Sequence, residues 1–186
     1  MGGNQHGLRI GDDGFPYMPA TQVRGLLRLG GIKLKSWQPQ LKDLFEINFG
    51  ERNKTYGNTW SFSPARYPTD AISISIVDAM SLGLLTEQSH IYIKDGIADN
   101  LFSCQKAGKS DDFSYWKGKI FSIEPAEEKD AAFLVACMRT EDRMGHRRSR
   151  GYGKISWNIN NVCSYKAGEK PVSLDKSLSD WLNIIL

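Results

Sequence analysis

The residue types that bind phosphate are concentrated in one short segment, residues 145–153. It contains three glycines and three arginines, with a histidine, a serine and a tyrosine. Glycines let the backbone approach an anion closely, and each arginine fork can form bidentate contacts with phosphate oxygens. The alternative interpretation is a solvated turn whose arginines remain hydrated. The pattern favours phosphodiester binding, with these residues as candidates: Gly145, His146, Arg147, Arg148, Ser149, Arg150, Gly151, Tyr152 and Gly153.

The charge around this segment differs from that of the whole chain. Between Arg139 and Lys154, six basic residues face two acids, which gives a local net charge of +4, whereas the full sequence carries +3. The remainder of the chain is therefore mildly acidic. We expect affinity for a nucleic acid to be local to this segment and to the first predicted helix, not spread over a basic surface.

A second phosphate-binding candidate lies on a helix predicted over residues 19–29. Thr21, Arg24 and Arg28 are spaced at i, i+3 and i+7, so one hydroxyl and two guanidinium groups share a face opposite the apolar one. The free N–H groups at the start of the helix offer another anion site. An ordinary exposed helix face is the alternative interpretation.

Few residues are candidates for catalysis. Cleavage of a phosphodiester by a neighbouring hydroxyl needs a base near that hydroxyl and an acid for the leaving oxygen. The weak candidates are His6, Asp12 and Asp13, and His146 lies inside the arginine segment. Adjacent residues on an extended chain point in opposite directions, which favours a turn over a metal site for the two aspartates. We expect surface histidines and no metal site.

The composition is that of a folded, soluble protein. The chain has 186 residues, of which 40% are hydrophobic and 24% charged, values that exclude a disordered or fibrous class. The longest apolar run, Ala131–Met138, is far shorter than the roughly 18 residues that a membrane-spanning helix needs. Cys104, Cys137 and Cys163 are widely spaced, which argues against a disulfide framework. We expect a cytoplasmic protein.

Periodicity predicts both helices and strands. The helix over 19–29 is expected to end at Gly30-Gly31, and the last helix is expected to start near Ser173. Apolar residues at i, i+3, i+4 and i+7 predict a helix after Pro125. The remaining predictions are a helix over 41–47 that closes near Gly50, strands over 71–77, 90–94, 115–123 and 154–159, and a loop or hairpin over 95–113. This order predicts an α+β fold, with helices packed on an antiparallel sheet.

Three segments together resemble a known family. Residues 14–28, GFPYMPATQVRGLLR, resemble the signature that opens the first helix of RAMP-superfamily proteins, the RNA-binding subunits of CRISPR effector complexes. Residues 44–50 and 57–63 are similar to the family's following stretch. Residues 145–153 are similar to its glycine-rich loop, and the order and separation of the segments also match.

The resemblance implies a ferredoxin-like (RRM-like) core with a thumb-like insertion. On this basis residues 1–160 form the RNA-binding domain, with the insertion at roughly 63–113, and residues 161–186 form a C-terminal extension with an amphipathic helix. The matching positions for contact with RNA are Thr21, Gln22 and Arg24 on the helix and the glycine and arginine residues of the 145–153 segment.

The resemblance also implies a function, and three alternatives stay open. The first is an RNA-binding subunit of a type III CRISPR–Cas ribonucleoprotein in antiviral defence, with guide RNA, target RNA and other Cas subunits as partners. The second is a ribonuclease of the same superfamily, which alone would need Mg²⁺. The third is a mainly structural assembly subunit whose C-terminal apolar stripe docks on a neighbour. The family's catalytic aspartate position falls near Asn4, which cannot act as an acid or base, so we expect binding without catalysis.

Overall fold

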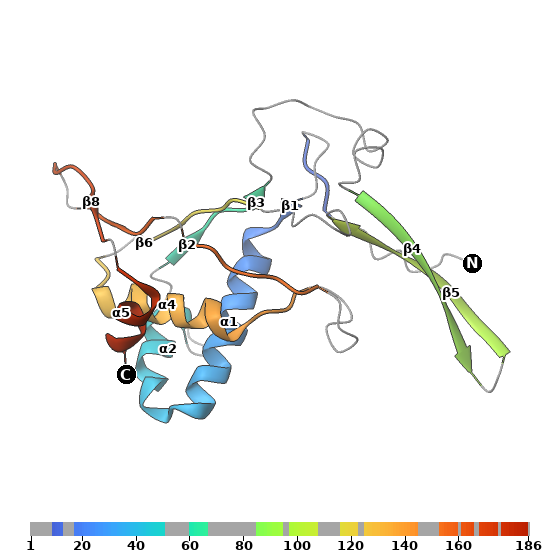
Figure 1. Cartoon of the computed structure of the whole chain (residues 1–186), viewed down its shortest axis with the longest axis horizontal. Helices are drawn as coiled ribbons and strands as arrows, with labels where there is room; N and C mark the ends of the chain where they lie inside the picture. The colour runs from blue at the N-terminus through green and yellow to red at the C-terminus, as the bar shows by residue number, and fades with distance from the viewer. Residues whose placement is uncertain are drawn as a thin grey trace. The chain divides into compact units, whose positions relative to one another are not determined.

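The chain divides into two compact units (Figure 1). The strand unit comprises Met1–Val23 and Phe62–Lys119, and the helix unit comprises Arg24–Ser61 and Ile120–Leu186. The structure is a computed structural model that describes residues 9–12, 17–50, 60–66, 85–94, 97–107, 116–122, 125–144, 153–159, 161–165, 168–174 and 176–185.

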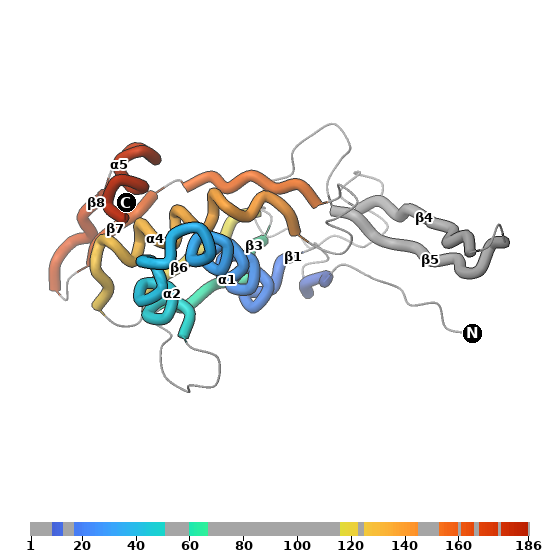
Figure 2. Tube along the Cα trace, turned by 90° about the horizontal axis from the view of Figure 1, so that it is seen from below, coloured from blue at the N-terminus to red at the C-terminus, as the bar shows by residue number. Residues whose placement is uncertain are grey.

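The helix unit is built on three packed helices, followed by a short C-terminal one (Figure 2). Their bounds are α1 (Ala20–Trp37, whose first residues belong to the strand unit), α2 (Lys42–Phe49, preceded by the 3-10 turn Pro39–Leu41), α4 (Glu128–Thr140) and α5 (Leu178–Asn183). Two strand pairs accompany them: β2 (Trp60–Phe62) with β6 (Ile120–Ser122), and β7 (Cys163–Ser164) with β8 (Val172–Ser173). Phe133 of α4 is fully buried, and its ring centroid lies 6.3 Å from that of Phe49 on α2.

Helix α1 does not end at Gly30-Gly31, so the predicted end of this helix is wrong. A Cβ atom on Gly30 would lie 2.2 Å from the carbonyl oxygen of Cys137, and one on Gly31 would lie 2.9 Å from the ring of Phe45. The two glycines therefore allow α1 to pack closely against α4 and α2. Cys137 and Phe45 reach these glycines only in the folded chain, so the local sequence pattern indicated a helix end at Gly30-Gly31.

The predictions for α2 and α4 are confirmed. Gly50 ends α2 with a φ of 76°, a conformation that glycine adopts without strain. At the start of α4, Glu127 and Asp130 form a reciprocal capping box. Asp130 also accepts a hydrogen bond of 3.1 Å from the fully buried Asn48, whose side-chain oxygen in turn accepts from the indole of Trp60. This buried polar network fixes α2, α4 and β2 to one another.

The last helix begins later than predicted. Ser173 lies in β8, and α5 starts at Leu178 because Ser177 and Asp180 form a capping box there. The apolar stripe predicted for this region packs on the chain itself: Trp181 is 3% exposed and contacts a cluster that includes Ala132 and Val135 of α4. Leu174 and Ile185 of the stripe pack against the same cluster, whereas Leu178 is 37% exposed. Most of the stripe is therefore used within the helix unit, and a docking role for the remainder stays a prediction.

The described part of the strand unit contains two antiparallel pairs. Strand β1 (Tyr17–Met18) pairs with β3 (Ala65–Arg66), and β4 (Leu85–Lys94) pairs with β5 (Ile97–Ala107) in a long hairpin. The predicted strand 90–94 is the end of β4. The segment 95–113, predicted as a loop or hairpin of its own, instead carries β5, the second strand of a hairpin whose first strand is β4. The predicted strand 71–77 lies outside the described residues.

Two further strand predictions hold only in part. Within 115–123 the regular strand is limited to β6. Within 154–159, Lys154 forms an isolated β-bridge with Arg143, and Ile155 and Trp157 each donate one hydrogen bond to the chain around residue 142, with no continuous ladder among the described residues. No helix in the described ranges is long and apolar enough to cross a lipid bilayer.

The mixture of helices with small antiparallel strand pairs confirms an α+β class. The ferredoxin-like sheet, the insertion at 63–113 and the division at residue 160 stay predictions.

Candidate nucleic-acid interface

The arginine-rich segment is held at the end of a short hairpin stem. Residues 145–152 lie outside the described residues, but both flanks are described. Arg143 and Lys154 form an antiparallel bridge. On one side of the bridge the N–H of Met144 donates to the Gly153 carbonyl at 2.9 Å, and on the other the N–H of Ile155 donates to the Asp142 carbonyl at 2.7 Å. The stem therefore brings the two ends of the segment together in one register.

Gly153 occupies a position that only glycine can fill. Its φ is 71°, and a Cβ atom there would lie 1.8 Å from the carbonyl oxygen of Met144, the residue across the stem. Any side chain would force the two arms apart. From the sequence, the glycines of this segment were expected to let the backbone approach a ligand closely. At Gly153 the close approach is instead to the chain's own backbone.

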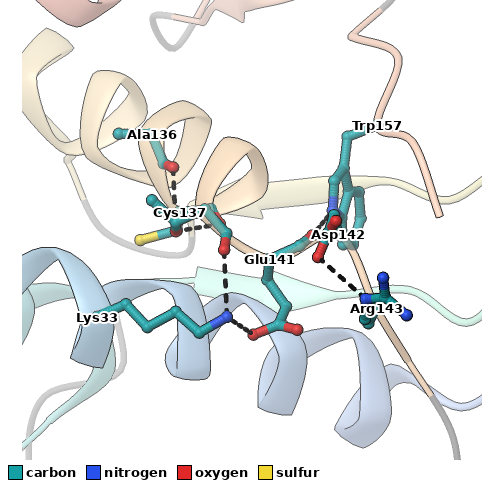
Figure 3. A network of polar contacts seen from close by, with 8 residues as sticks. Lys33, Ala136, Cys137, Glu141, Asp142, Arg143 and Trp157 are labelled. Carbon is teal, nitrogen blue, oxygen red and sulfur yellow. Dashed lines mark hydrogen bonds and ion pairs between the residues drawn. The ribbon is translucent and has the colours of Figure 1, made fainter. Parts of the chain in front are cut away.

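The base of the stem is anchored by Glu141, which is 3% exposed (Figure 3). Its carboxylate forms an ion pair of 2.9 Å with the ammonium group of Lys33 on α1. Its backbone carbonyl accepts a hydrogen bond of 2.9 Å from the indole N–H of Trp157, which follows the second arm. One residue therefore connects both arms of the stem to α1.

The end of α4 reinforces this anchor. Lys33 also donates to the carbonyl of Thr140 at 3.3 Å, and a cation at the C-terminus of a helix is favoured by the helix dipole. The hydroxyl of Thr140 donates to the carbonyl of Cys137 at 3.0 Å. Cys137 itself is fully buried, and this burial raises the pKa of its thiol, which keeps the sulfur protonated and unreactive.

The two predicted arginines of α1 are half-buried against α2. Arg24 Nη2 donates to the carbonyl of Phe49 at 3.4 Å, at the C-terminal end of α2. The guanidinium of Arg28 lies 5.4 Å from the ring centroid of Phe45, and the ammonium of Lys35 lies 4.4 Å from the same ring. These contacts hold the guanidinium groups in place and use only part of their donors. The part of the α1 surface where these guanidinium groups can meet a ligand is therefore smaller than the helical spacing of the arginines alone predicts.

Thr21 and Gln22 lie in the first turn of α1 and are exposed to solvent. The carbonyl of Pro19 starts this turn by accepting from the N–H groups of Gln22 and Val23 at 2.9 and 3.1 Å. Two of the three side chains of this helix that the family resemblance assigns to the RNA backbone are thus accessible, and their role stays a prediction.

The catalytic candidates are only partly described. Asp12 is exposed, whereas His6, Asp13 and His146 lie outside the described residues. In the part of the chain that the structure covers, no three His, Cys, Asp or Glu side chains gather as metal ligands would. A catalytic role for these residues stays a prediction.

Sequence reasoning missed the anchor residues Lys33, Glu141 and Trp157. One indication of this anchor was present in the sequence, because Glu141 is one of two acidic residues inside a strongly basic stretch. Its partner Lys33 lies 108 positions away, on a part of α1 that was expected to lie beyond the helix end. No local periodicity could connect the two.

Comparison with known proteins finds similar folds among solved structures. No protein-family model matches the chain, and no curated protein matches its sequence. Among solved structures, the chain is similar to one from the cryo-EM structure of the type III-B Cmr-beta bound to cognate target RNA, with 11% identity and a TM-score of 0.53. The match covers 79% of this chain and 85% of the other. At this identity the likeness shows the fold alone, and the chain shares that fold with a component of a type III-B CRISPR complex.

Proposed function

We propose that this chain is an RNA-binding subunit of a type III CRISPR–Cas effector ribonucleoprotein. In this proposal it holds guide RNA, and the duplex of guide and target, through the 145–153 loop and the first helix. Other Cas subunits are its partners, and antiviral defence in the cytoplasm is its setting. The fold likeness to a chain of an RNA-bound type III-B complex supports this assignment.

The anchored hairpin is the observation that carries the proposal. The bridge between Arg143 and Lys154 and the contacts of Glu141 fix the flanks of the arginine-rich loop. A loop whose ends are already fixed loses less conformational entropy when it binds than a free loop would. A solvated turn would need neither a buried carboxylate at its base nor a glycine at residue 153, where any side chain would be strained.

The chemistry of the loop suits a phosphodiester backbone. Three arginines at positions 147, 148 and 150 offer planar forks to phosphate oxygens. Contacts of this kind read no base sequence, so we propose that affinity depends little on the guide's sequence and strongly on ionic strength.

The test replaces Arg147, Arg148 and Arg150 together with alanine. We expect affinity for a fluorescein-labelled single-stranded RNA, measured by fluorescence anisotropy, to fall on the order of 10- to 100-fold because three charge-assisted contacts are lost. The matched control removes the same charge elsewhere, with alanine at three exposed lysines, Lys42, Lys129 and Lys170. Equal affinities in the two triple variants would reject the assignment of RNA binding to the loop.

A further inference from the structure

Four chain segments of the strand unit place Arg9, Tyr17, Arg66 and Lys117 side by side. Tyr17 lies directly opposite Arg66 in the β1–β3 pair, and Arg66 lies directly opposite Lys117 in an antiparallel bridge. On the other side, the N–H of Tyr17 donates to the carbonyl of Arg9 at 2.9 Å. At a strand spacing of about 4.8 Å, this row spans roughly 14 Å.

The row lies on the solvent side of a two-faced sheet. Directly opposed residues share a face, and the neighbouring pair Met18 and Ala65, which points to the other side, is 7% and 9% exposed. Arg9, Arg66 and Lys117 are exposed, and Tyr17 is half-buried. Lys119 is two residues from Lys117, so strand alternation places this exposed lysine on the same face.

This face, which we call the basic row, combines one aromatic ring with four cations: Arg9, Arg66, Lys117 and Lys119. The backbone groups of Lys117 and Lys119 are engaged with the neighbouring segment, since the two N–H groups donate to the Arg66 carbonyl and the Ser63 hydroxyl at 2.7 Å each. Among the described residues, the ammonium groups of these two lysines have no side-chain partner. These hydrogen bonds fix the backbone of both lysines, and their side-chain charges remain available.

Tyr17 and Arg66 form a stacking platform. The guanidinium carbon of Arg66 lies 5.0 Å from the centroid of the Tyr17 ring. Tyrosine rings and arginine planes are the surfaces on which unpaired bases stack, and cations beside them attract the phosphates of the same strand. A flat π-surface next to several cations is therefore the chemistry of a single-stranded nucleic acid site.

We propose that the basic row is a second binding site for single-stranded RNA on this chain, separate from the arginine-rich loop. The Tyr17–Arg66 pair stacks a base, while Arg9, Lys117 and Lys119 contact the phosphates on either side. The inference rests on the proposed RNA-binding function and adds to it a surface in the strand unit. An acidic polypeptide would match the charge of the row but would gain little from the aromatic platform, so RNA is the occupant that the combination favours.

The experiment measures binding of fluorescein-labelled oligouridine to the full chain and three variants. Tyr17→Leu removes the ring, and we expect a loss of roughly 5- to 100-fold, the effect of losing one stacked base. Tyr17→Phe keeps the ring and is expected to bind within about twofold of the wild type. The double variant K117Q/K119Q is expected to lower the slope of log affinity against log salt by about 1.

The control double variant K42Q/K170Q removes two exposed charges from the helix unit and should leave the slope nearly unchanged. If Tyr17→Leu does not fold, K117Q/K119Q carries the test, because both lysine side chains are exposed. Wild-type affinity in both Tyr17→Leu and K117Q/K119Q would overturn the proposal. Equally tight binding of poly-L-glutamate, insensitive to Tyr17→Leu, would instead identify a surface for acidic protein and would also overturn it.

The outcomes separate this inference from the proposed function. If the wild type does not bind oligouridine, both fail. If the Arg147, Arg148 and Arg150 variant loses affinity while the basic-row variants do not, the second site alone fails. If only the basic-row variants lose affinity, the second site stands and the assignment to the loop fails.

Discussion

The close approach of the two arms of the hairpin stem depends on a single residue, Gly153. Substitution of Gly153 is opposed by its positive φ, which other residues rarely adopt. It is also opposed by a clash, because a Cβ atom would lie 1.8 Å from the Met144 carbonyl oxygen. Gly168 also has a positive φ, of 82°, but has open space around it. The two glycines therefore form a matched pair in which the effect of the clash can be isolated.

Gly153→Ala is expected to lower the free energy of unfolding by about 1–3 kcal/mol, the usual cost of a strained backbone, with a further loss from the clash. Gly168→Ala is expected to cost about 1 kcal/mol, because only the left-handed conformation is penalised. Urea denaturation followed by tryptophan fluorescence measures both. Equal losses in the two variants would show that the contact across the stem is unimportant.

Cys137 offers a second test at the scale of one residue. The thiol is buried and burial raises its pKa, whereas Cys163 is only half-buried. In a Cys104→Ser background, Ellman's reagent is expected to titrate one thiol quickly in the native state and the second only after unfolding. Rapid modification of both thiols without denaturant would contradict the packing of α4 against Gly30.

The hairpin stem depends on Glu141, which connects both arms of the stem to helix α1. Lys33→Met is expected to destabilise the fold by about 1–3 kcal/mol because it removes the cation from a carboxylate that is 4% exposed. The control is Lys42→Met, which breaks an ion pair of 3.7 Å with Glu46 in which the lysine is 65% exposed, and it should cost less than about 0.5 kcal/mol. Chemical denaturation compares them, and a smaller effect for Lys33→Met than for Lys42→Met would refute the anchor.

The cap of α5 predicts a pH dependence. Hydrogen bonds from the hydroxyl and backbone N–H of Ser177 lower the pKa of Asp180 below its ordinary value of 3.8. A lowered pKa in the folded state means that the stabilisation is complete above the ordinary value and is lost as the pH falls through the lowered one.

The thermal stabilities of the wild type and Asp180→Ala should therefore differ most above about pH 5 and converge as the pH falls below 3.8. Tryptophan fluorescence follows the unfolding, and Trp181, the buried residue that follows Asp180, contributes to this signal. A difference that stays constant down to about pH 2 would show that the carboxylate does not cap the helix.

Elements were predictable from sequence where local signals decide them. The period of α4 and the glycine at the end of α2 are such signals, and both predictions are confirmed. The extent of α1 was not predictable, because the role of Gly30 and Gly31 depends on Cys137 and Phe45, which reach them only in the folded chain. For the same reason periodicity identified the C-terminal apolar stripe but not its partner, α4.

At the scale of the whole molecule, the small net charge of +3 conceals two groups of basic residues, one contiguous in the sequence at 145–153 and one assembled as the basic row. The arginine-rich loop of the helix unit was visible in the sequence because its residues are contiguous. The basic row of the strand unit was not visible, since β pairing assembles it from four separate segments around Tyr17 and Arg66. Contiguous motifs can be identified in a sequence, whereas a surface built from several strands can be identified only when the pairing of residues between the strands is known.

The central claim is that Arg147, Arg148 and Arg150 neutralise RNA phosphates, and the salt dependence of binding tests it most directly. For a single strand, log affinity falls with log salt by about 0.7 for each neutralised phosphate. Alanine at Arg147, Arg148 and Arg150 should therefore reduce the slope by about 2, while alanine at Lys42, Lys129 and Lys170 should leave it unchanged. An unaltered slope in the loop variant, at any affinity, would contradict the account.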